Sequence, residues 1–171
     1  MSPPLFGVAG WKNSGKTTLM VGLIGELNKR GYSISVIKHA HSNFEIDHRG
    51  RDSFKMRSAG ACQIVLSSPK RFALMRELGG TPELAFGDIL AYVRGCDLVL
   101  VEGFKREALP KIEIRRNGAA SREPLYGTVP GIVAIASDRP KDETDLLPVF
   151  QLDDISGIAD FILGRLGLGK A

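Results

Sequence analysis

A segment near the N-terminus has the residue types and spacing of a phosphate-binding loop. Residues 10–17 read G-W-K-N-S-G-K-T and satisfy the pattern G-x-x-x-x-G-K-[ST]. The glycines allow backbone N–H groups to converge on phosphate oxygens, and a helix that begins at the loop adds its partial positive charge. Lys16, also a candidate catalytic residue, would reach the β- and γ-phosphates, Thr17 would bind Mg²⁺ and Thr18 would contact the α-phosphate. The residues predicted to bind the nucleotide here are Gly10, Lys12, Asn13, Ser14, Gly15, Lys16, Thr17 and Thr18.

The flanking sequence places this loop between a strand and a helix. Residues 5–9 form a short apolar run, and residues 16–30 carry leucines at positions 19, 23 and 27, the spacing of one helix face. A glycine turn that merely joins strand and helix is the alternative interpretation. It leaves Lys16 unexplained, because the helix dipole disfavours a cation at a helix N-terminus unless an anion lies there too.

A glutamate ends the most apolar stretch of the chain. Residues 97–102 read D-L-V-L-V-E, which is typical of a strand covered on both faces in a parallel sheet. P-loop proteins hold Mg²⁺ with a carboxylate at the C-terminal end of a nearby strand, directly or through water. We therefore predict Glu102 as a metal-binding residue, with an exposed loop acid as the alternative. Asp97 would lie about 16 Å from that edge and is expected to cap the far end of the strand.

A polar, aperiodic loop follows the second predicted strand. Residues 39–51 contain all of the histidines in the chain, which are His39, His41 and His48. Three interpretations stay open: a transition-metal site on the histidines, a loop with only local turn hydrogen bonds, and a switch-like loop. In the third, Asp47 or Asp52 approaches the magnesium or the attacking water, so both are candidate catalytic residues.

The charge balance favours an anionic partner. The formal net charge is +4 and the pI is near 9.2, but the basic residues are scattered and not interleaved with aromatic ones. We therefore expect phosphorylated small molecules and no nucleic acid. One later basic group would either hold an anionic substrate or form a solvated charged face, and its members are Lys105, Arg106, Lys111, Arg115, Arg116 and Arg122.

The cysteines and the N-terminus bear on location. Cys62 and Cys96 have no CxxC spacing, which favours free thiols over a disulfide framework or a zinc site. The N-terminal residues have the pattern of neither a signal peptide nor a membrane span. We expect a cytoplasmic protein with no membrane association.

Hydrophobic periodicity predicts strands and helices in alternation. Further strands are predicted at residues 33–38, 62–67, 71–78, 97–102, 111–116 and 132–136. Further helices are predicted at residues 52–59, 81–94 and 155–166, the last capped by Asp153 or Asp154. Isoleucines alternate with charges in residues 111–116, which favours a half-exposed or edge strand. The order predicts the α/β class and a P-loop NTPase three-layer fold, with a mostly parallel central sheet, helices on both faces and one domain over residues 1–171.

Several motifs follow one another along most of the chain. They are G-W-K-N-S-G-K-T-T-L at residues 10–19, V-I-K-H-A-H at 36–41, E-I-D-H-R-G-R-D-S at 45–53, R-S-A-G-A at 57–61, L-V-L-V-E-G-F-K at 98–105 and P-K-I-E at 110–113. The phosphate loop alone is unspecific, whereas K-H-x-H, G-x-D-S and V-E-G-F-K in this order are far more specific. Together they resemble the MobB family, the molybdopterin-guanine dinucleotide biosynthesis protein B of molybdenum cofactor assembly.

The resemblance implies a dimeric GTP-binding adaptor with weak GTPase activity, which assists the attachment of GMP to molybdopterin. The implied ligands are GTP, Mg²⁺ and molybdopterin or its guanine dinucleotide. The implied partners are the molybdopterin guanylyltransferase and molybdoenzyme apoproteins. By position, the resemblance implies that Gly15, Lys16 and Thr17 bind phosphate and magnesium. It also implies that three acidic residues lie near the metal, which are Asp47, Asp52 and Glu102.

Base recognition has a less direct signal. Guanine selectivity usually needs an aspartate that pairs with the N1–H and amino groups of the base, yet the chain has no N-K-x-D sequence. Asp138, which follows a predicted strand, is our candidate substitute, with a loop or cap residue as the alternative. Two other functions stay open: a small-molecule phosphotransferase with Asp47 or Asp52 as base, and a histidine-dependent metal-insertion chaperone NTPase.

Overall fold

The structure is a computed structural model that describes residues 3–40, 44–143 and 146–169. It divides into two compact units, which we describe separately. The sheet unit comprises residues 1–39 and 90–171, and the hairpin unit comprises residues 40–89. The prediction of one domain over residues 1–171 stays a prediction.

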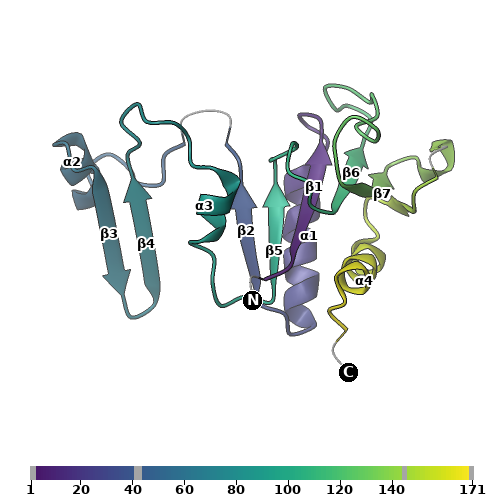
Figure 1. The fold of residues 1–171 in the computed structure, drawn as a ribbon, viewed down its shortest axis with the longest axis horizontal. Coiled ribbons are helices and arrows are strands. Elements are labelled where there is room, and N and C mark those ends of the chain that lie inside the picture. The colour runs from purple at the N-terminus through teal and green to yellow at the C-terminus, as the bar shows by residue number, and fades with distance from the viewer. Residues whose placement is uncertain (1–2, 41–43, 144–145, 170–171) are drawn as a thin grey trace. The chain divides into compact units, whose positions relative to one another are not determined.

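The sheet unit is built on six parallel strands in the order β2-β5-β1-β6-β7-β8 (Figure 1). Parallel pairing brings the carboxyl ends of neighbouring strands to one edge, where ligands bind in α/β proteins. The predicted α/β class with a parallel sheet is confirmed. The strands are β1 (Leu5–Gly10), β2 (Ile34–Lys38), β5 (Leu98–Glu102), β6 (Lys111–Arg115), β7 (Ile132–Ser137) and β8 (Val149–Gln151).

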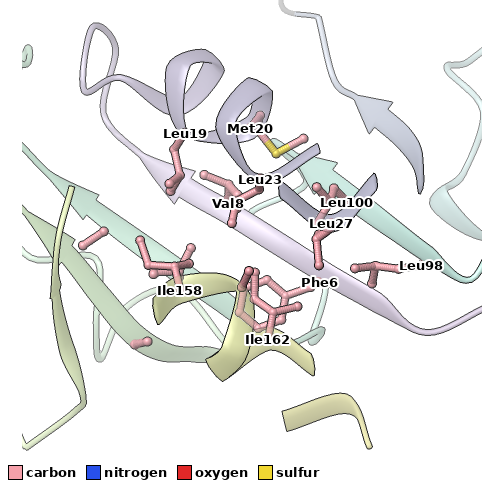
Figure 2. Close-up of a cluster of buried hydrophobic side chains, with 14 of the residues drawn as sticks. Phe6, Val8, Leu19, Met20, Leu23, Leu27, Leu98, Leu100, Ile158 and Ile162 are labelled. Atoms are coloured by element: carbon pink, nitrogen blue, oxygen red, sulfur yellow. The ribbon is translucent and has the colours of Figure 1, made fainter. Parts of the chain in front are cut away.

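Two helices pack on the same face of this sheet. Helix α1 (Lys16–Lys29) and helix α4 (Ile155–Leu166) share one apolar core with the alternate residues Phe6 and Val8 of β1 (Figure 2). Phe6, Leu23 and Ile162 are fully buried there. Asp154, one of the two caps that the sequence predicted, caps α4 by accepting a hydrogen bond from the Gly157 N–H. A short 3-10 helix, η1, spans Pro140–Asp142.

The opposite face near β1 is covered by the chain that leads into β7. Ala9 of β1 packs with Leu125 and Ile132, and Trp11 and Val129 lie against them. The far end of β5 is tied down as predicted, since the Asp97 carboxylate accepts hydrogen bonds from the backbone N–H and the hydroxyl of Ser33. Of the helices in the described part of the chain, none has both the length and the apolar character that a membrane crossing requires.

Strand β6 corrects one prediction. We expected a half-exposed or edge strand, but β6 lies between β1 and β7 and all five of its residues are buried. Its charges are satisfied inside the protein. The Lys111 ammonium donates to the carbonyls of Leu109 at 3.2 Å and Pro130 at 2.9 Å, and also to that of Glu107. Burial lowers the pKa of Lys111, and the nearby Glu107 carboxylate opposes that shift. Because β6 is paired with β1 on one side and β7 on the other, it has no free edge through which a strand of a second chain could pair.

The hairpin unit consists of α2 (Asp52–Ser58) and the antiparallel strands β3 (Gln63–Ser68) and β4 (Arg71–Arg76). All three were predicted. The helix predicted at residues 81–94 is much shorter, because α3 spans only Phe86–Leu90. Thr81 does not cap it: both its N–H and its hydroxyl donate to the Leu78 carbonyl, which makes a turn there instead.

Candidate nucleotide-binding site

The predicted phosphate loop joins the end of β1 to the start of α1. Gly15, the N-cap residue of α1, adopts a left-handed conformation with φ 95° and ψ 15°, and Asn13 has φ 63°. Glycine and asparagine are the residues that adopt such conformations most readily. No side chain caps this helix N-terminus in the described structure. The first backbone N–H groups of α1, which have no partner within the helix, therefore face an open end where an anion can bind.

Ser14 is the buried polar group at the centre of the loop. It is 0% exposed, and its Oγ has no hydrogen-bond partner among the described residues. A Cβ built at Gly10 would lie only 2.5 Å from this oxygen, so glycine is required for the loop to close. Leaving a buried hydroxyl unpaired costs about 1–3 kcal/mol. A phosphate oxygen would accept its hydrogen bond, so the loop fits the group that the sequence predicts for it.

Lys16 lies over the same loop. Its ammonium donates hydrogen bonds to the carbonyls of Trp11 at 2.7 Å and Gly10 at 3.1 Å. Burial lowers the pKa of Lys16, the Glu102 carboxylate raises it, and the Lys105 and Lys38 ammonium groups lower it further. The cation is thus held at the loop by two weak carbonyl acceptors, which a phosphate can replace with charge-assisted bonds.

Glu102 ends β5 at the edge of the sheet beside the loop. Its register partners are Val8 of β1 and Lys38 of β2, and its side chain is 12% exposed. The carboxylate lies 3.3 Å from the Lys38 ammonium. Because Glu102 pairs with Val8, two residues before the loop begins at Gly10, it lies at the predicted end of the strand, on the edge of the sheet beside the loop. Thr17 lies in the first, solvent-exposed turn of α1. A hydroxyl and a carboxylate are suitable oxygen ligands for Mg²⁺.

A cavity of about 550 Å³ adjoins the loop within the sheet unit. This volume lies in the range of small-molecule sites. The cavity runs from the start of α1 to the ends of β7 and β8, so it lies at the ligand-binding edge of the sheet. The residues that line it include Ser14, Gly15, Thr18, Arg116, Asp138, Gln151 and Asp153.

Asp138 follows β7 directly and faces this cavity. One carboxylate oxygen, Oδ2, accepts a hydrogen bond from the Asn117 N–H at 2.8 Å. The other, Oδ1, lies 3.5 Å from the Arg122 guanidinium and has no hydrogen-bond partner among the described residues. The carboxylate is therefore oriented from one side and still has free acceptor capacity.

Asp138 is connected to a series of ion pairs that the sequence analysis did not predict. Arg122 also donates to the Glu143 carboxylate at 3.1 Å, and Glu143 accepts from Arg115 at 2.7 Å. Arg115 in turn pairs with Glu113 at 3.0 Å. We call Glu113, Arg115, Arg122, Asp138 and Glu143 the buried ionic chain, after its buried members Glu113, Arg115 and Glu143; the Arg122 and Asp138 side chains at its outer end are 34% and 28% exposed. Only the alternation of charge in residues 111–116 hinted at it.

The basic group predicted from sequence is not one surface. Lys111 and Arg115 are buried and serve the fold, and Arg122 belongs to the buried ionic chain. Lys105 lies over the Trp11 ring, 4.7 Å from its centroid, in a cation–π contact. Arg116 lines the cavity. A single anion site built from all of them is therefore wrong.

The candidate catalytic acids lie in the hairpin unit. The Asp47 carboxylate, 8% exposed, pairs with Arg57 at 2.9 Å, and the exposed Asp52 lies 3.3 Å from Lys55. Their catalytic roles stay predictions. Among the histidines, His39 packs on the Phe104 ring at 4.9 Å, His48 is exposed, and His41 lies outside the described residues. Within residues 3–40, 44–143 and 146–169, no cluster of three metal-binding side chains occurs.

The parallel sheet, the glycine turn after β1 and the helix that begins at Lys16 define an α/β protein of the P-loop class. The family model described as "MobB: Molybdopterin guanine dinucleotide synthesis protein B" matches residues 5–138. The chain belongs to the MobB family of molybdopterin-guanine dinucleotide biosynthesis adapter proteins.

Individual relatives agree over nearly the whole chain. The molybdopterin-guanine dinucleotide biosynthesis adapter protein of Escherichia coli (strain K12) is 37% identical over 94% of this chain and 91% of its own length. The protein of the same name from Haemophilus influenzae is 41% identical over 93% of this chain and 87% of its own. A crystal structure of molybdopterin-guanine biosynthesis protein B superposes with a TM-score of 0.74 at 27% identity, and covers 95% of this chain and 99% of that one. The predicted family is confirmed, and so is the α/β P-loop fold with its parallel sheet. Helices were predicted on both faces, whereas α1 and α4 both pack on one face of the sheet unit.

Proposed function

We propose that this chain binds GTP with Mg²⁺ at the loop of residues 10–17 and acts as an adapter in the biosynthesis of molybdopterin-guanine dinucleotide. One observation carries the proposal: the cavity beside the loop is lined both by the buried Ser14 hydroxyl and by the Asp138 carboxylate. Neither the Ser14 Oγ nor the Asp138 Oδ1 has a hydrogen-bond partner among the described residues. A guanine nucleotide offers a phosphate to the first and N–H donors to the second. We propose that GTP hydrolysis at this loop is slow.

The metal would be held by Thr17 and Glu102, with phosphate oxygens and water completing its oxygen shell. Bound Mg²⁺ neutralises charge on the phosphates. In the structure, the Glu102 carboxylate forms an ion pair with the Lys38 ammonium at 3.3 Å. If Glu102 held the metal, the Lys38 ammonium would be available to a phosphate oxygen.

The guanine assignment is tested by Asp138→Asn. An aspartate accepts from both the N1–H and the amino group of guanine, whereas asparagine presents an amide donor to that amino group. Xanthine has an oxygen at the same ring position and accepts from the asparagine. We expect GTP affinity to fall by about tenfold or more and XTP affinity to rise, both measured by calorimetric titration.

Asp153→Asn provides the matched control, because Asp153 lines the same cavity and loses the same charge. This variant is expected to keep the preference of the wild type for GTP over XTP. A switch toward XTP in Asp153→Asn, or its absence in Asp138→Asn, would contradict the role given to Asp138.

The partners follow from family membership and from the names of the relatives. We propose that the chain assists a molybdopterin guanylyltransferase in the cytoplasm, with molybdopterin or its guanine dinucleotide as a further ligand and molybdoenzyme apoproteins as recipients. Support for this comes from the adapter proteins of E. coli and H. influenzae, which are similar over most of their length.

We also propose that the chain forms a homodimer through its hairpin unit. Strands β3 and β4 form a two-stranded sheet, so each presents an edge that no described strand covers. Val65, Leu66 and Phe72 on these strands are 56%, 45% and 68% exposed, which is typical of an apolar contact surface. Phe72→Glu should shift sedimentation toward the monomer at micromolar concentration, whereas Val21→Glu on helix α1 should not. A wild-type monomer under these conditions would refute the dimer.

A further inference from the structure

Arg116 is an arginine beside the phosphate loop whose side chain forms no hydrogen bond or ion pair with any described residue. It follows β6 directly and was predicted only as one member of a diffuse basic group. The register of the sheet and the packing around the loop define its position.

The register places Arg116 on the same side of the sheet as helix α1. Ile114 of β6 is paired with Gly10, the last residue of β1, so the chain leaves both strands at the same edge. Ile112 and Ile114 point into the core formed with α1 and α4. Side chains alternate along a strand, so the next residue on this side is Arg116. It therefore emerges next to the first turn of α1.

Packing around the loop agrees with that placement of the exposed Arg116 side chain. A Cβ built at Gly15 would lie 3.5 Å from Nη1 of Arg116. The turn that carries Arg116 is bonded to the phosphate loop, because the Ala120 N–H donates to the Lys12 carbonyl at 2.8 Å. Arg116 also lines the cavity together with Thr18 and Asp138. The guanidinium thus lies beside the start of α1 and lines the same cavity as Asp138.

We propose that Arg116 binds the α-phosphate of the nucleotide, as a specificity-determining residue supplied within the same chain. The inference rests on the proposed function, since it presupposes a nucleotide with its phosphates on the loop and its base near Asp138. A guanidinium binds phosphate through paired N–H donors and carries no side-chain partner that it must first give up. In this arrangement Lys16 serves the β- and γ-phosphates, and Arg116 serves the phosphate nearest the ribose.

Four ligands that differ only in phosphate number test this assignment: GTP, GDP, GMP and guanosine. Affinities are measured by displacement of a fluorescent guanine nucleotide from the wild type, Arg116→Ala and Lys16→Ala. Arg94→Ala is the matched control, because Arg94 is an exposed arginine just before β5, at the opposite edge of the sheet. We expect Arg116→Ala to bind GTP, GDP and GMP about tenfold more weakly and guanosine unchanged.

The other variants separate this proposal from the proposed function. Lys16→Ala should weaken GTP and GDP but leave GMP nearly unchanged, and Arg94→Ala should match the wild type. If Lys16→Ala binds every ligand like the wild type, the loop is not the phosphate site and both proposals are overturned. If Lys16→Ala behaves as expected and Arg116→Ala matches Arg94→Ala, only the Arg116 assignment is overturned. A loss that extends equally to guanosine, or is confined to GTP, also overturns it.

Discussion

The Lys16→Ala variant is expected to bind Mg²⁺–GTP at least tenfold more weakly than the wild type, a loss of about 1.4 kcal/mol or more. The Lys16 ammonium now bonds to two loop carbonyls, those of Gly10 and Trp11. Charge-assisted bonds to phosphate oxygens are stronger than these, so the nucleotide gains from the exchange. Calorimetric titration of the two proteins at one salt concentration measures the difference.

Lys29→Ala controls for the loss of one positive charge. Lys29 is exposed in the last turn of the same helix, at the end remote from the loop. Its removal should leave GTP affinity within experimental error, because exposed charges at such a distance are screened by salt. Equal losses in the two variants would mean that Lys16 acts only through net charge.

The Glu113→Ala variant is expected to lose about 3–5 kcal/mol of the free energy of unfolding. Glu113 is 1% exposed, and its carboxylate accepts from the N–H groups of Leu125 at 2.8 Å and Tyr126 at 3.0 Å while it pairs with Arg115. Alanine would leave two backbone donors without acceptors and a buried guanidinium with one carboxylate fewer. Urea denaturation followed by circular dichroism measures the change.

Asp160→Ala is the comparison for a surface ion pair. The Asp160 side chain is 69% exposed and pairs with Arg30 on α1. Exposed pairs contribute about 0–1 kcal/mol, so this variant should unfold close to the wild type. If Glu113→Ala costs no more than Asp160→Ala, the buried ionic chain does not stabilise the fold in the way its geometry indicates.

The phosphate loop could be predicted from sequence because its conformation is determined locally. The glycines, Asn13 and the start of α1 specify the turn within a few residues, and the strand before it is apolar. The position of Glu102 could also be predicted from the sequence, since an acid at the end of a buried parallel strand lies at the ligand-binding edge of the sheet. The Asp154 cap and the Asp97 contact at the far end of β5 also depend on residue type and position alone.

Strand β6 was misread because its environment is set by residues far away in the chain. Alternating isoleucine and charge is the pattern of a half-exposed strand. The same pattern also occurs in a buried strand when residues distant in sequence pair with its charged side chains. Here these partners are the Glu143 carboxylate and the N–H groups of Leu125 and Tyr126. No local rule predicts those partners. The position of Arg116 at the cavity depends on the same pairing of β6 with β1 and β7.

The prediction of a helix over residues 81–94 was wrong because too much weight was given to a local sequence signal. Threonine followed by proline is typical of a helix start. Thr81 instead bonds backward to the Leu78 carbonyl, and the helix begins only at Phe86. Side chains that can cap a helix can equally close a turn, and the sequence does not distinguish the two.

We propose that the loop of residues 10–17 binds the phosphates of a guanine nucleotide together with magnesium. Calorimetric titration of the wild-type chain with GTP, carried out in excess Mg²⁺ and again in EDTA, with ATP as the competing nucleotide, measures this binding directly. The proposed site predicts saturable binding of one GTP per chain, weaker binding in EDTA, and weaker binding of ATP than of GTP. Absence of GTP binding in the presence of Mg²⁺ would contradict it.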